Sequence, residues 1–467
     1  MESLKDLAKL ISDSAKQIED SCARRGVALP ALEDPATTAN DVAFDDPLVK
    51  QAAGNIVAAA AQLTALVRPP TDTLQCLILG SQTAAALRVV VKGHIVEILK
   101  PHGRAGLHAD EIAKQSGINS NRLARILHLL ASEHILTEVS HNVFALNRVS
   151  AIMDTGKTPQ AIRAAPEDKY VGTDGVAANV DFMGHLIYKA AAYLPEHLLD
   201  PANTSDSLDP PFNRVFNTTM WEYLERPENT HELRLFGLMM RGISKSLPSP
   251  ANGGFDFTSL PAGSKVADVG GGVGSQSMVF ARAYPHLKYV VQDRGSSSND
   301  MHTHWNAGYP EALASGQVSF QAIDLFSEQP AKDVALFFVR LVLHNWPDDK
   351  CIAILKNLRA AAQPDTRLLI LEVLLSSAVP SQSAPASLEG QGVAVKPPAP
   401  LLLNAGNQGV LLHMYDMIMM GVCMGGAQER TLDQFNALFA ASGWKTERVY
   451  RQPYYVIGTS QIVAAPA

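Results

Sequence analysis

Five short apolar runs after residue 264 constrain the fold of this chain more than any other feature. Helical stretches separate them, and in chain order they read SKVADVG, KYVVQD, VSFQAID, ALFFVRLV and RLLILEVL. Strands that alternate with helices predict an α/β domain with a doubly wound, mostly parallel sheet. The last two segments, WKTERVYRQ and YYVIGTSQIVAA, have no helix between them. They predict an antiparallel hairpin at one edge of that sheet.

The first of these runs leads into a glycine-rich turn. VADVGGGVGSQS begins as a strand, turns at Gly270, Gly271, Gly272 and Gly274, and then enters a helix. Glycines permit positive φ and let the backbone approach a ligand closely, and the free N–H groups at a helix start favour polar or anionic partners. The turn therefore indicates a nucleotide-type cofactor, with a plain strand-to-helix turn as the alternative. Because Ser275 stands where the dinucleotide fingerprint has its third glycine, NAD is disfavoured.

Three aspartates mark the ends of predicted strands. Asp268 precedes the glycines and is placed to orient the turn, Asp293 closes KYVVQD, and Asp324 closes VSFQAID. Asp293 stands at the distance along the chain at which a carboxylate accepts hydrogen bonds from both hydroxyls of a ribose. Ligands of such sheets bind just outside the carboxyl ends of the strands, so we expect the three side chains to converge on one crevice. Ordinary strand-end capping is the alternative for each of them.

A histidine and two glutamates form a candidate catalytic set. In FFVRLVLHNWPDDKCIAILKNL, Pro347 marks a helix start, so His344 lies between a strand end and that helix, at the edge where chemistry is expected. Glu372 interrupts the apolar run LLILEVLL at a position that should be buried, and a buried carboxylate needs a partner, here a histidine. Glu429, in GGAQERT, follows a glycine pair and is the third member.

No metal site and no disulfide framework are predicted. His302 and His304 form an HxH pair, but this pair alone does not make the ligand set of a zinc site. The four cysteines are far apart and include no CxxC pair: Cys22, Cys76, Cys351 and Cys423. This pattern fits a reducing compartment.

The N-terminal half is predicted to be mainly helical. Apolar residues recur at helical spacing within residues 1–25, which describes an amphipathic helix that needs a partner surface, so we expect a homodimer with this region at its interface. Residues 108–150 fit a helix-turn-helix followed by a hairpin, as in a winged helix. DNA binding is one hypothesis for that module. It is disfavoured because four basic residues there are balanced by four acidic ones, and because the whole chain has a net charge of −7.

A length of 467 residues predicts two or three compact units. We expect a helical dimerisation domain with the winged-helix-like module at 1–165, a helical connector contributing to the substrate pocket at 166–245, and the α/β domain at 246–467. The last contains an insertion rich in Pro and Ser at 376–408. The first 25 residues lack the apolar stretch of a signal peptide, and the most apolar runs noted, at 335–339 and 368–375, are strand length. We therefore expect a cytoplasmic protein with no membrane and no nucleic-acid partner.

Taken together, these motifs resemble the S-adenosylmethionine-dependent O-methyltransferases of the plant and fungal small-molecule type, as in caffeate O-methyltransferases. DVGGGVG, the strand-end Asp293 and LHNWPD carry the resemblance, which covers most of the chain. It implies a Rossmann-like methyltransferase domain, S-adenosyl-L-methionine as the cofactor, a small-molecule substrate and a homodimer.

The resemblance also implies roles for individual residues. His344 matches the catalytic base of an HDW-type motif, and Glu372 and Glu429 match the acids that flank and orient it. The expected cofactor-binding positions are Asp268, Gly270, Gly272, Asp293, Asp324, which matches the residue beside the adenine, and Arg340, the basic residue four before the histidine. We expect Phe236, Met240 and Met419 to bind the substrate.

The chemistry of methyl transfer agrees with this set. Transfer from a sulfonium is an in-line displacement, so the enzyme mainly aligns the acceptor oxygen with the methyl carbon and removes a proton. A neutral imidazole held in one tautomer by a carboxylate suits a phenol with a pKa of about 10, without a metal. We therefore expect an O-methyltransferase that acts on a hydroxyl of an aromatic or polyketide-derived secondary metabolite.

One alternative enzyme class remains. Some fungal proteins that resemble this family bind the cofactor yet catalyse pericyclic reactions or dehydrations. Two features depart from the family pattern: Asn345 stands where many relatives have Asp, and the insertion follows Glu372. The complete set of His344, Glu372 and Glu429 favours methyl transfer, because a pericyclic reaction has no need of a base.

Overall fold

The computed structural model describes residues 4–34, 38–201, 209–246, 254–379, 396–423, 425–456 and 458–467. Its contacts divide the chain into two compact units, Met1–Asn203 with Pro211–Ser246, and Thr204–Pro210 with Leu247–Ala467. The segment expected as a separate connector, 166–245, falls in the first unit except for Thr204–Pro210, which is grouped with the second. Residues 380–395 of the predicted insertion at 376–408 lie outside the described residues.

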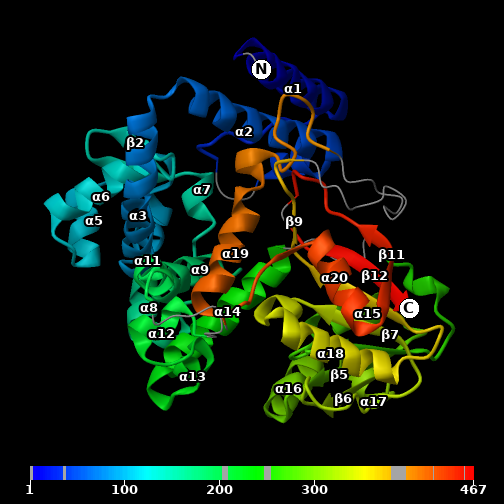
Figure 1. Cartoon of the computed structure of the whole chain (residues 1–467). Helices are drawn as coiled ribbons and strands as arrows, with labels where there is room; N and C mark the ends of the chain where they lie inside the picture. Colours follow the sequence, from blue (N-terminus) through cyan, green and yellow to red (C-terminus); the bar gives the residue numbers. More distant parts are fainter. Residues whose placement is uncertain are drawn as a thin grey trace. The chain divides into compact units, whose positions relative to one another are not determined.

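The first unit is mainly helical (Figure 1). Its helices are α1 (Leu4–Arg25), α2 (Pro47–Val67), α3 (Pro70–Lys92), α4 (Ile95–Leu99), α5 (Ala109–Ser116), α6 (Ser120–Ser132), α7 (Arg148–Ala151), α8 (Pro159–Ala164), α9 (Val176–Phe182), α10 (Tyr188–Ala192), α11 (Leu194–Leu198), α12 (Pro211–Phe216), α13 (Met220–Glu225) and α14 (Thr230–Ser246). Its strands are β1 (Leu107–His108), β2 (Leu136–Ser140) and β3 (Val143–Leu146).

The amphipathic N-terminal helix finds its partner within the chain. Leu7 and Ile18 of α1 are buried, and Ile18 shares a core cluster with Val49 and Ala52 of α2. The partner surface of α1 thus lies at least partly within the chain, and the place of this region at a subunit interface stays a prediction. Hydrophobic side chains are instead exposed along α2 and α3, at Val57, Leu66, Val67, Leu74, Leu77, Ile78 and Leu79.

Helix α3 corrects the expectation that the most apolar runs of the chain are only as long as a strand. It holds an 18-residue window with a mean hydropathy of 1.5, of which 17% is buried, so by length and composition it is able to cross a membrane. A single helix of this kind is weak evidence for a membrane span, because an exposed apolar face also suits a protein–protein interface.

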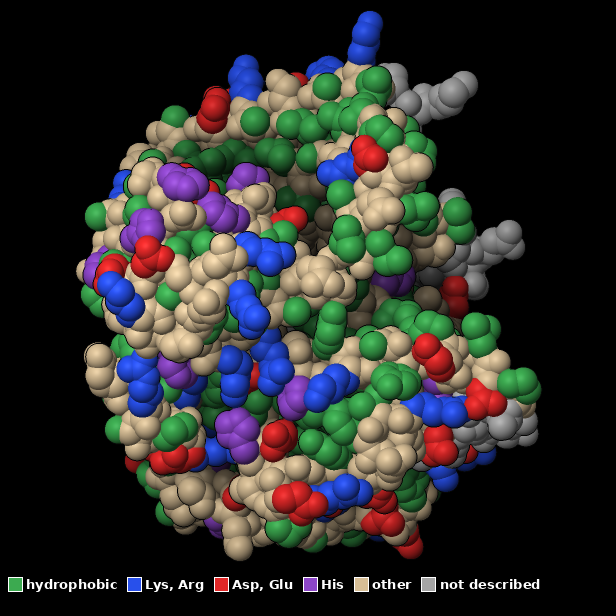
Figure 2. Space-filling model, turned by 90° about the vertical axis from the view of Figure 1, so that its left-hand side faces the viewer, with side chains coloured by type: hydrophobic (Ala, Val, Ile, Leu, Met, Phe, Trp, Pro, Cys, Tyr) green, Lys and Arg blue, Asp and Glu red, His purple; other side chains and the backbone are tan. Residues whose placement is uncertain are grey.

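The winged-helix-like module forms as expected. Leu123, Leu127 and Leu130 give α6 its buried face, and the three short strands pair antiparallel in the order β1-β3-β2. The face of the molecule in Figure 2 shows Lys and Arg side chains interspersed with Asp, Glu and His. The expected absence of a nucleic-acid partner stays a prediction.

The second unit is built on a seven-stranded sheet of order β11-β12-β8-β7-β4-β5-β6. Its strands are β4 (Lys265–Val269), β5 (Lys288–Asp293), β6 (Val318–Ala322), β7 (Val334–Arg340), β8 (Arg367–Glu372), β11 (Trp444–Tyr450) and β12 (Ser460–Pro466), and a separate parallel pair joins β9 (Leu374–Leu375) to β10 (Arg430–Thr431). Five strands run parallel, and β12 pairs antiparallel with both β8 and β11. The doubly wound sheet and the edge hairpin are both confirmed.

Helices cover both faces of this sheet. They are α15 (Ser275–Ala283), α16 (Ser298–Gly308), α17 (Pro310–Ala314), α18 (Asp348–Ala361) and α20 (Leu432–Ser442), while α19 (Val410–Val422) of the same unit belongs to neither core cluster of the sheet. One core cluster joins α18 and α20 to the strands, and a second joins α15, α16 and α17. The central strands β7 and β8 are largely apolar, as expected for strands buried on both faces, and ligands of such sheets bind at the carboxyl ends of the strands.

Candidate active site

The glycine-rich turn after β4 leaves room above its backbone. Gly270 and Gly272 have φ values of +74° and +58°, in the left-handed region that favours glycine. A side chain at Gly272 would meet nothing within 4 Å, whereas one at Gly270 would lie 2.7 Å from Val342. Gly270 thus allows the close approach of a neighbouring loop, and Gly272 presents bare backbone to open space. A turn of this form suits a cofactor that lies against the main chain.

Asp293 ties this turn to the end of β5. One carboxylate oxygen accepts the Gly272 N–H at 2.8 Å, and the other accepts the Arg294 N–H at 2.7 Å and the Ser297 hydroxyl at 3.1 Å. Each oxygen of a carboxylate has two acceptor sites, so these bonds leave capacity for a ligand. These bonds use three of the four acceptor sites, and the predicted contact with the ribose hydroxyls stays a prediction.

The other predicted cofactor residues differ in burial. Asp268 lies beneath the turn and accepts a hydrogen bond from Ser277 at 2.6 Å, and burial raises its pKa to about 6 against the effect of that bond. Asp324 caps its own turn by accepting from Phe326 N–H at 3.0 Å and from Ser327 at 3.2 Å. Burial lowers the pKa of Arg340, while Asp268 and Glu372 oppose that change. Of these three residues, Asp268, buried beneath the turn and bonded to Ser277, is the one placed to brace the turn.

The loop that carries His344 follows β7 and is held by Glu372. Leu341 has a φ of +52°, and a short 3₁₀ turn, Leu343–Asn345, follows before α18 begins. One carboxylate oxygen of Glu372 accepts the N–H groups of Val342 at 3.0 Å and Leu343 at 2.9 Å. Glu372 therefore fixes the backbone of the loop as well as facing the histidine.

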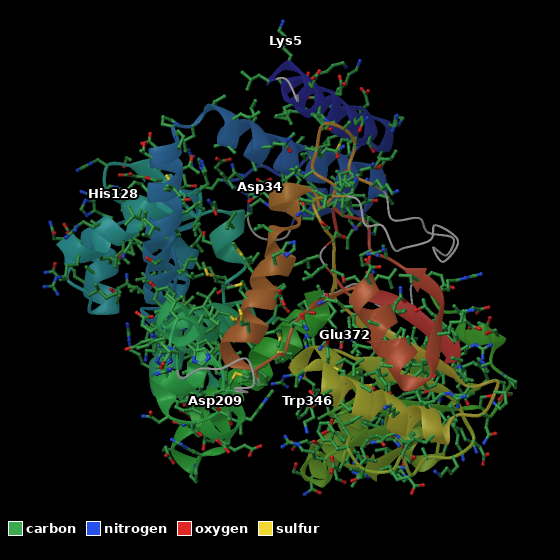
Figure 3. All side chains as sticks on the ribbon, in the orientation of Figure 1. Lys5, Asp34, His128, Asp209, Trp346 and Glu372 are labelled. Atoms are coloured by element: carbon green, nitrogen blue, oxygen red, sulfur yellow. The ribbon has the colours of Figure 1, made fainter. Side chains whose placement is uncertain are left out.

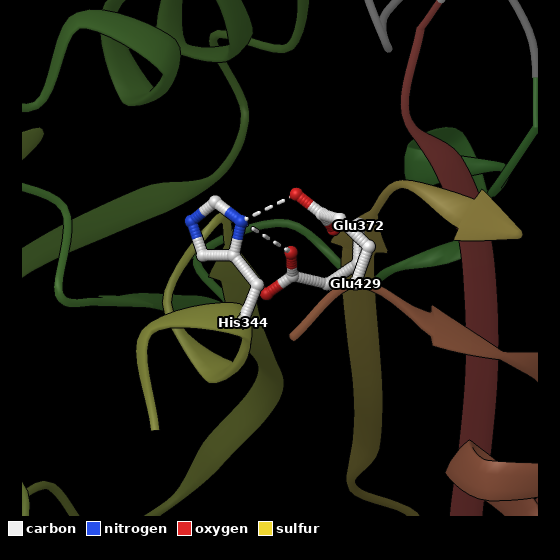
Figure 4. A group of neighbouring side chains, drawn as sticks. All are labelled: His344, Glu372 and Glu429. Atoms are coloured by element: carbon white, nitrogen blue, oxygen red, sulfur yellow. Dashed lines mark hydrogen bonds and ion pairs between the residues drawn. The ribbon is translucent and has the colours of Figure 1, made fainter. Parts of the chain in front are cut away.

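The imidazole of His344 points one nitrogen at both glutamates. Its Nδ1 lies 2.9 Å from Glu429 Oε1 and 3.9 Å from Glu372 Oε2 (Figure 4). The other ring nitrogen points away from both carboxylates (Figure 4). An ionised carboxylate only accepts hydrogen bonds, so Nδ1 donates, and in the neutral ring Nε2 keeps its lone pair. This is the tautomer that a general base at Nε2 needs.

Buried charges set the protonation of this group. Burial alone would lower the pKa of His344, but the negative charge of Glu372 and the hydrogen bond to Glu429 raise it to about 8. Burial, with the nearby charge of Glu429, raises the pKa of Glu372 to about 7 against the effect of His344. The side chains of Glu372 and Glu429 are 1% and 3% exposed, so these charges act with little screening by water.

The three side chains also have the spacing of metal ligands. One ligand atom from each of His344, Glu372 and Glu429 lies within 4.8 Å of the others. The absence of a metal from the chemistry thus stays a prediction. The HxH pair is used otherwise: His302 bonds the Ser298 carbonyl at 2.8 Å, and His304 lies 3.4 Å from the Ser275 hydroxyl.

The predicted substrate residues lie in both units. Phe236 and Met240 belong to α14 of the first unit, where the Phe236 ring lies 5.5 Å from the rings of Phe182 and Trp221. Met419 belongs to α19, which is part of the second unit. Trp346 and Glu372, labelled in Figure 3, belong to the second unit as well. Contact of these side chains with a substrate stays a prediction.

Two residues of the site were missed by the sequence analysis. Asp416 of α19 accepts the Glu429 N–H at 2.8 Å, and burial raises its pKa. Arg430, next to Glu429, is buried with its side chain 0% exposed. A lone carboxylate in the apolar helix VLLHMYDMIMMGV was the available signal for Asp416. For Arg430 the only signal was its place beside Glu429.

Comparison with known proteins shows that this sequence is similar to O-methyltransferases. The sequence matches the model of an O-methyltransferase domain over residues 192–396 and of an O-methyltransferase dimerisation domain over residues 75–155. An O-methyltransferase of Armillaria gallica is 39% identical over 456 residues, covering 96% of this chain and 95% of that protein. The 4-O-methyltransferase 1 of Phanerochaete chrysosporium is 37% identical over 454 residues, covering 96% of each.

Solved structures show the same fold at lower identity. The mitomycin 7-O-methyltransferase MmcR superposes with a TM-score of 0.63 at 22% identity, covering 87% of this chain and 99% of that one. LepI in complex with S-adenosylmethionine (SAM) superposes with a TM-score of 0.66 at 17% identity, covering 91% and 96%. The architecture is thus shared by enzymes whose relationship in sequence is distant.

Proposed function

Because the chain belongs to the O-methyltransferase family, whose methyl donor is S-adenosylmethionine, we propose that it methylates a phenolic hydroxyl with His344 as the general base. The observation that carries this proposal is the bond of 2.9 Å between His344 Nδ1 and Glu429, with Nε2 directed away from both carboxylates (Figure 4). The acceptor in this proposal is an aromatic or polyketide-derived secondary metabolite.

The cofactor is assigned to the crevice at the carboxyl ends of β4, β5 and β6. When bound, it supplies an electrophilic methyl group on a positively charged sulfur. Bare backbone at Gly272 and the spare acceptor capacity of Asp293 support this placement. In the proposal Gly270 shapes the turn, Asp268 braces it from below, and Asp324 and Arg340 complete the polar rim.

The protein's own groups then handle the acceptor proton. Nε2 of His344 would take the proton of the phenol, and Glu429 and Glu372 would stabilise the imidazolium that forms. The phenol oxygen would receive the methyl group of the bound cofactor, with the electron pair of the broken carbon–sulfur bond staying on the sulfur. A pKa of about 8 keeps a useful fraction of the base neutral near pH 7 and lies close to the value of about 10 for a phenol. The ring is only 15% exposed, so water competes little for this proton.

The names of the relatives support an oxygen acceptor. They include a 4-O-methyltransferase and a 3-O-methyltransferase of Phanerochaete chrysosporium, so different ring or chain positions are used within the family. A homodimer is supported by the match to the dimerisation domain and by the exposed apolar side chains of α2 and α3. Location in the cytoplasm stays a prediction.

Incubation with methyl-labelled S-adenosylmethionine and a panel of phenols tests the proposal. We expect a product heavier by one labelled methyl in place of a proton, found by mass spectrometry, and none when the hydroxyl is blocked as an ether. A polyketide-type substrate that reacts with no change in mass, or with loss of water and no label, would instead indicate a pericyclic or dehydration reaction on the same fold.

A further inference from the structure

Adjacent residues at the start of β10 contact opposite parts of the His344 loop. Glu429 bonds the imidazole, whereas Arg430 reaches the main chain on either side of it. We propose that Arg430 is a positioning residue for methyl transfer, which fixes the backbone that carries His344 while Glu429 fixes the ring. The inference rests on the proposed role of His344 as the base.

The guanidinium of Arg430 brackets the histidine. Its Nη1 donates to the carbonyl of Leu343 at 3.0 Å, and its Nη2 donates to the carbonyl of Trp346 at 2.8 Å. These carbonyls stand one residue before His344 and two residues after it. A planar fork with several N–H groups is suited to hold two acceptors at once, which the point charge of a lysine does less well.

A carboxylate at the start of α18 holds the guanidinium in place. Asp348 Oδ1 lies 2.7 Å from Arg430 Nη2 and 3.0 Å from Nε. The Arg430 side chain is 0% exposed, and Asp348 is 56% exposed. A buried charge needs such a partner, and the pair also ties the helix after the loop to the strand before α20.

The loop is thereby held from two sides. Glu372 accepts the Leu343 N–H, while Arg430 donates to the Leu343 carbonyl. The His344 carbonyl accepts the Gln428 N–H at 3.0 Å. The backbone around the base is therefore anchored by groups on either side of it. With its backbone fixed, the side chain of His344 keeps only its own torsions, and the hydrogen bond to Glu429 restricts the orientation of the ring.

The rate of methyl transfer depends strongly on where a general base such as His344 is held. A displacement of about 1 Å in a catalytic group costs about 100-fold in rate. Replacing Arg430 by Lys keeps the charge near Asp348 but weakens the two-carbonyl clamp. We expect Arg430→Lys to lower kcat about 30- to 100-fold. The KM for the acceptor and the Kd for S-adenosylmethionine should change less than about threefold, because among the described residues the side chain of Arg430 bonds to the His344 loop, Gln428 and Asp348.

Arg359→Lys provides a matched control. Arg359 lies on α18 in the same unit, and its Nε donates to the Gly443 carbonyl at 2.9 Å, so it also ties a helix to another segment. Loss of this bond should lower Tm and leave kcat unchanged. Low-field proton NMR adds a second readout, since the Nδ1–H of His344 bonded to Glu429 should give a resonance that shifts or broadens in Arg430→Lys and not in Arg359→Lys.

The outcomes separate the inference from its premise. If His344→Ala keeps full methyl transfer, the proposed base is wrong. If His344→Ala is impaired but Arg430→Lys has the kcat and NMR signal of the native enzyme, only the positioning role fails. The positioning role would also be overturned if Arg430→Lys lowered Tm and cofactor affinity together with kcat. Should Arg430→Lys not fold, Asp348→Asn weakens the anchor of the guanidinium from an exposed site, and the same split between kcat and Kd is expected at smaller size.

Discussion

The two halves of the proposed site are built in different ways. The centre of the proposed cofactor crevice is local, since β4, the glycine turn and the end of β5 lie within 30 residues of one another, from Lys265 to Asp293, and only its rim at Asp324 and Arg340 comes from later in the chain. The base is assembled from β8, the loop after β7 and the segment before β10, and His344 and Glu429 are 85 residues apart. The crevice depends on backbone shape, whereas the base depends on buried charges. We therefore expect changes to one half to leave the function of the other intact.

The largest effect should follow from Glu429→Gln. The amide still fits beside Nδ1, but it removes the charge that stabilises the imidazolium and is able to donate, which permits the wrong tautomer. We expect kcat to fall about 10²- to 10⁴-fold while calorimetry shows native affinity for S-adenosylmethionine. A weakened cofactor affinity of similar size would show that the two halves are not separable.

Asp293→Ala should lower the affinity for S-adenosylmethionine and leave kcat nearly unchanged. Charged hydrogen bonds contribute about 1.5–3 kcal/mol each, so the affinity for S-adenosylmethionine should fall about 10- to 100-fold for each one lost. At saturating cofactor, kcat should stay within a few-fold of the native value. Unchanged affinity in calorimetry would remove Asp293 from the cofactor site.

Gly270→Ala tests the shape of the turn. The new methyl would lie 2.7 Å from Val342 on a backbone with a φ of +74°, so the folded state should lose about 1–3 kcal/mol. Gly272→Ala has a similar φ but open space, and it should destabilise the fold less while still obstructing the cofactor. Chemical denaturation and calorimetry together check this, and equal unfolding free energies for the two variants would contradict it.

The smallest effect is a shift in pH dependence. The base works when deprotonated, so kcat should rise with pH through a midpoint of about 8 and then level off. Glu372 is the first of the groups that raise the pKa of His344, so Glu372→Gln should move the midpoint below 8 and lower the plateau. The midpoint belongs to the coupled pair, because Glu372 itself titrates near 7. A pH profile that does not move in this variant would argue against the coupling.

Much of this architecture followed from local patterns in the sequence. The strand runs, the glycine turn and the edge hairpin each depend on residues close in the chain, and their periodicity is visible without tertiary information. The burial of Glu372 was predicted because a charge interrupts an apolar strand, and the residue is 1% exposed.

Features that depend on which surfaces meet were not predicted. The apolar face of α1 packs on α2 while α3 exposes its own, and helical periodicity does not tell which face a neighbour covers. Arg430 was missed for the same reason. Its partners are backbone carbonyls more than 80 residues away, and backbone acceptors are present at every position of a sequence.

The rate of methyl transfer in His344→Ala tests the central claim most directly. Single-turnover reactions with labelled S-adenosylmethionine and a phenolic acceptor, measured beside His302→Ala as a control for an exposed histidine, give the chemical step alone. We expect a loss of about 10²- to 10⁴-fold with unchanged cofactor affinity, shrinking as the pH approaches the pKa of the phenol, because solvent then supplies the phenolate. A variant that transfers methyl at the native rate would contradict the account.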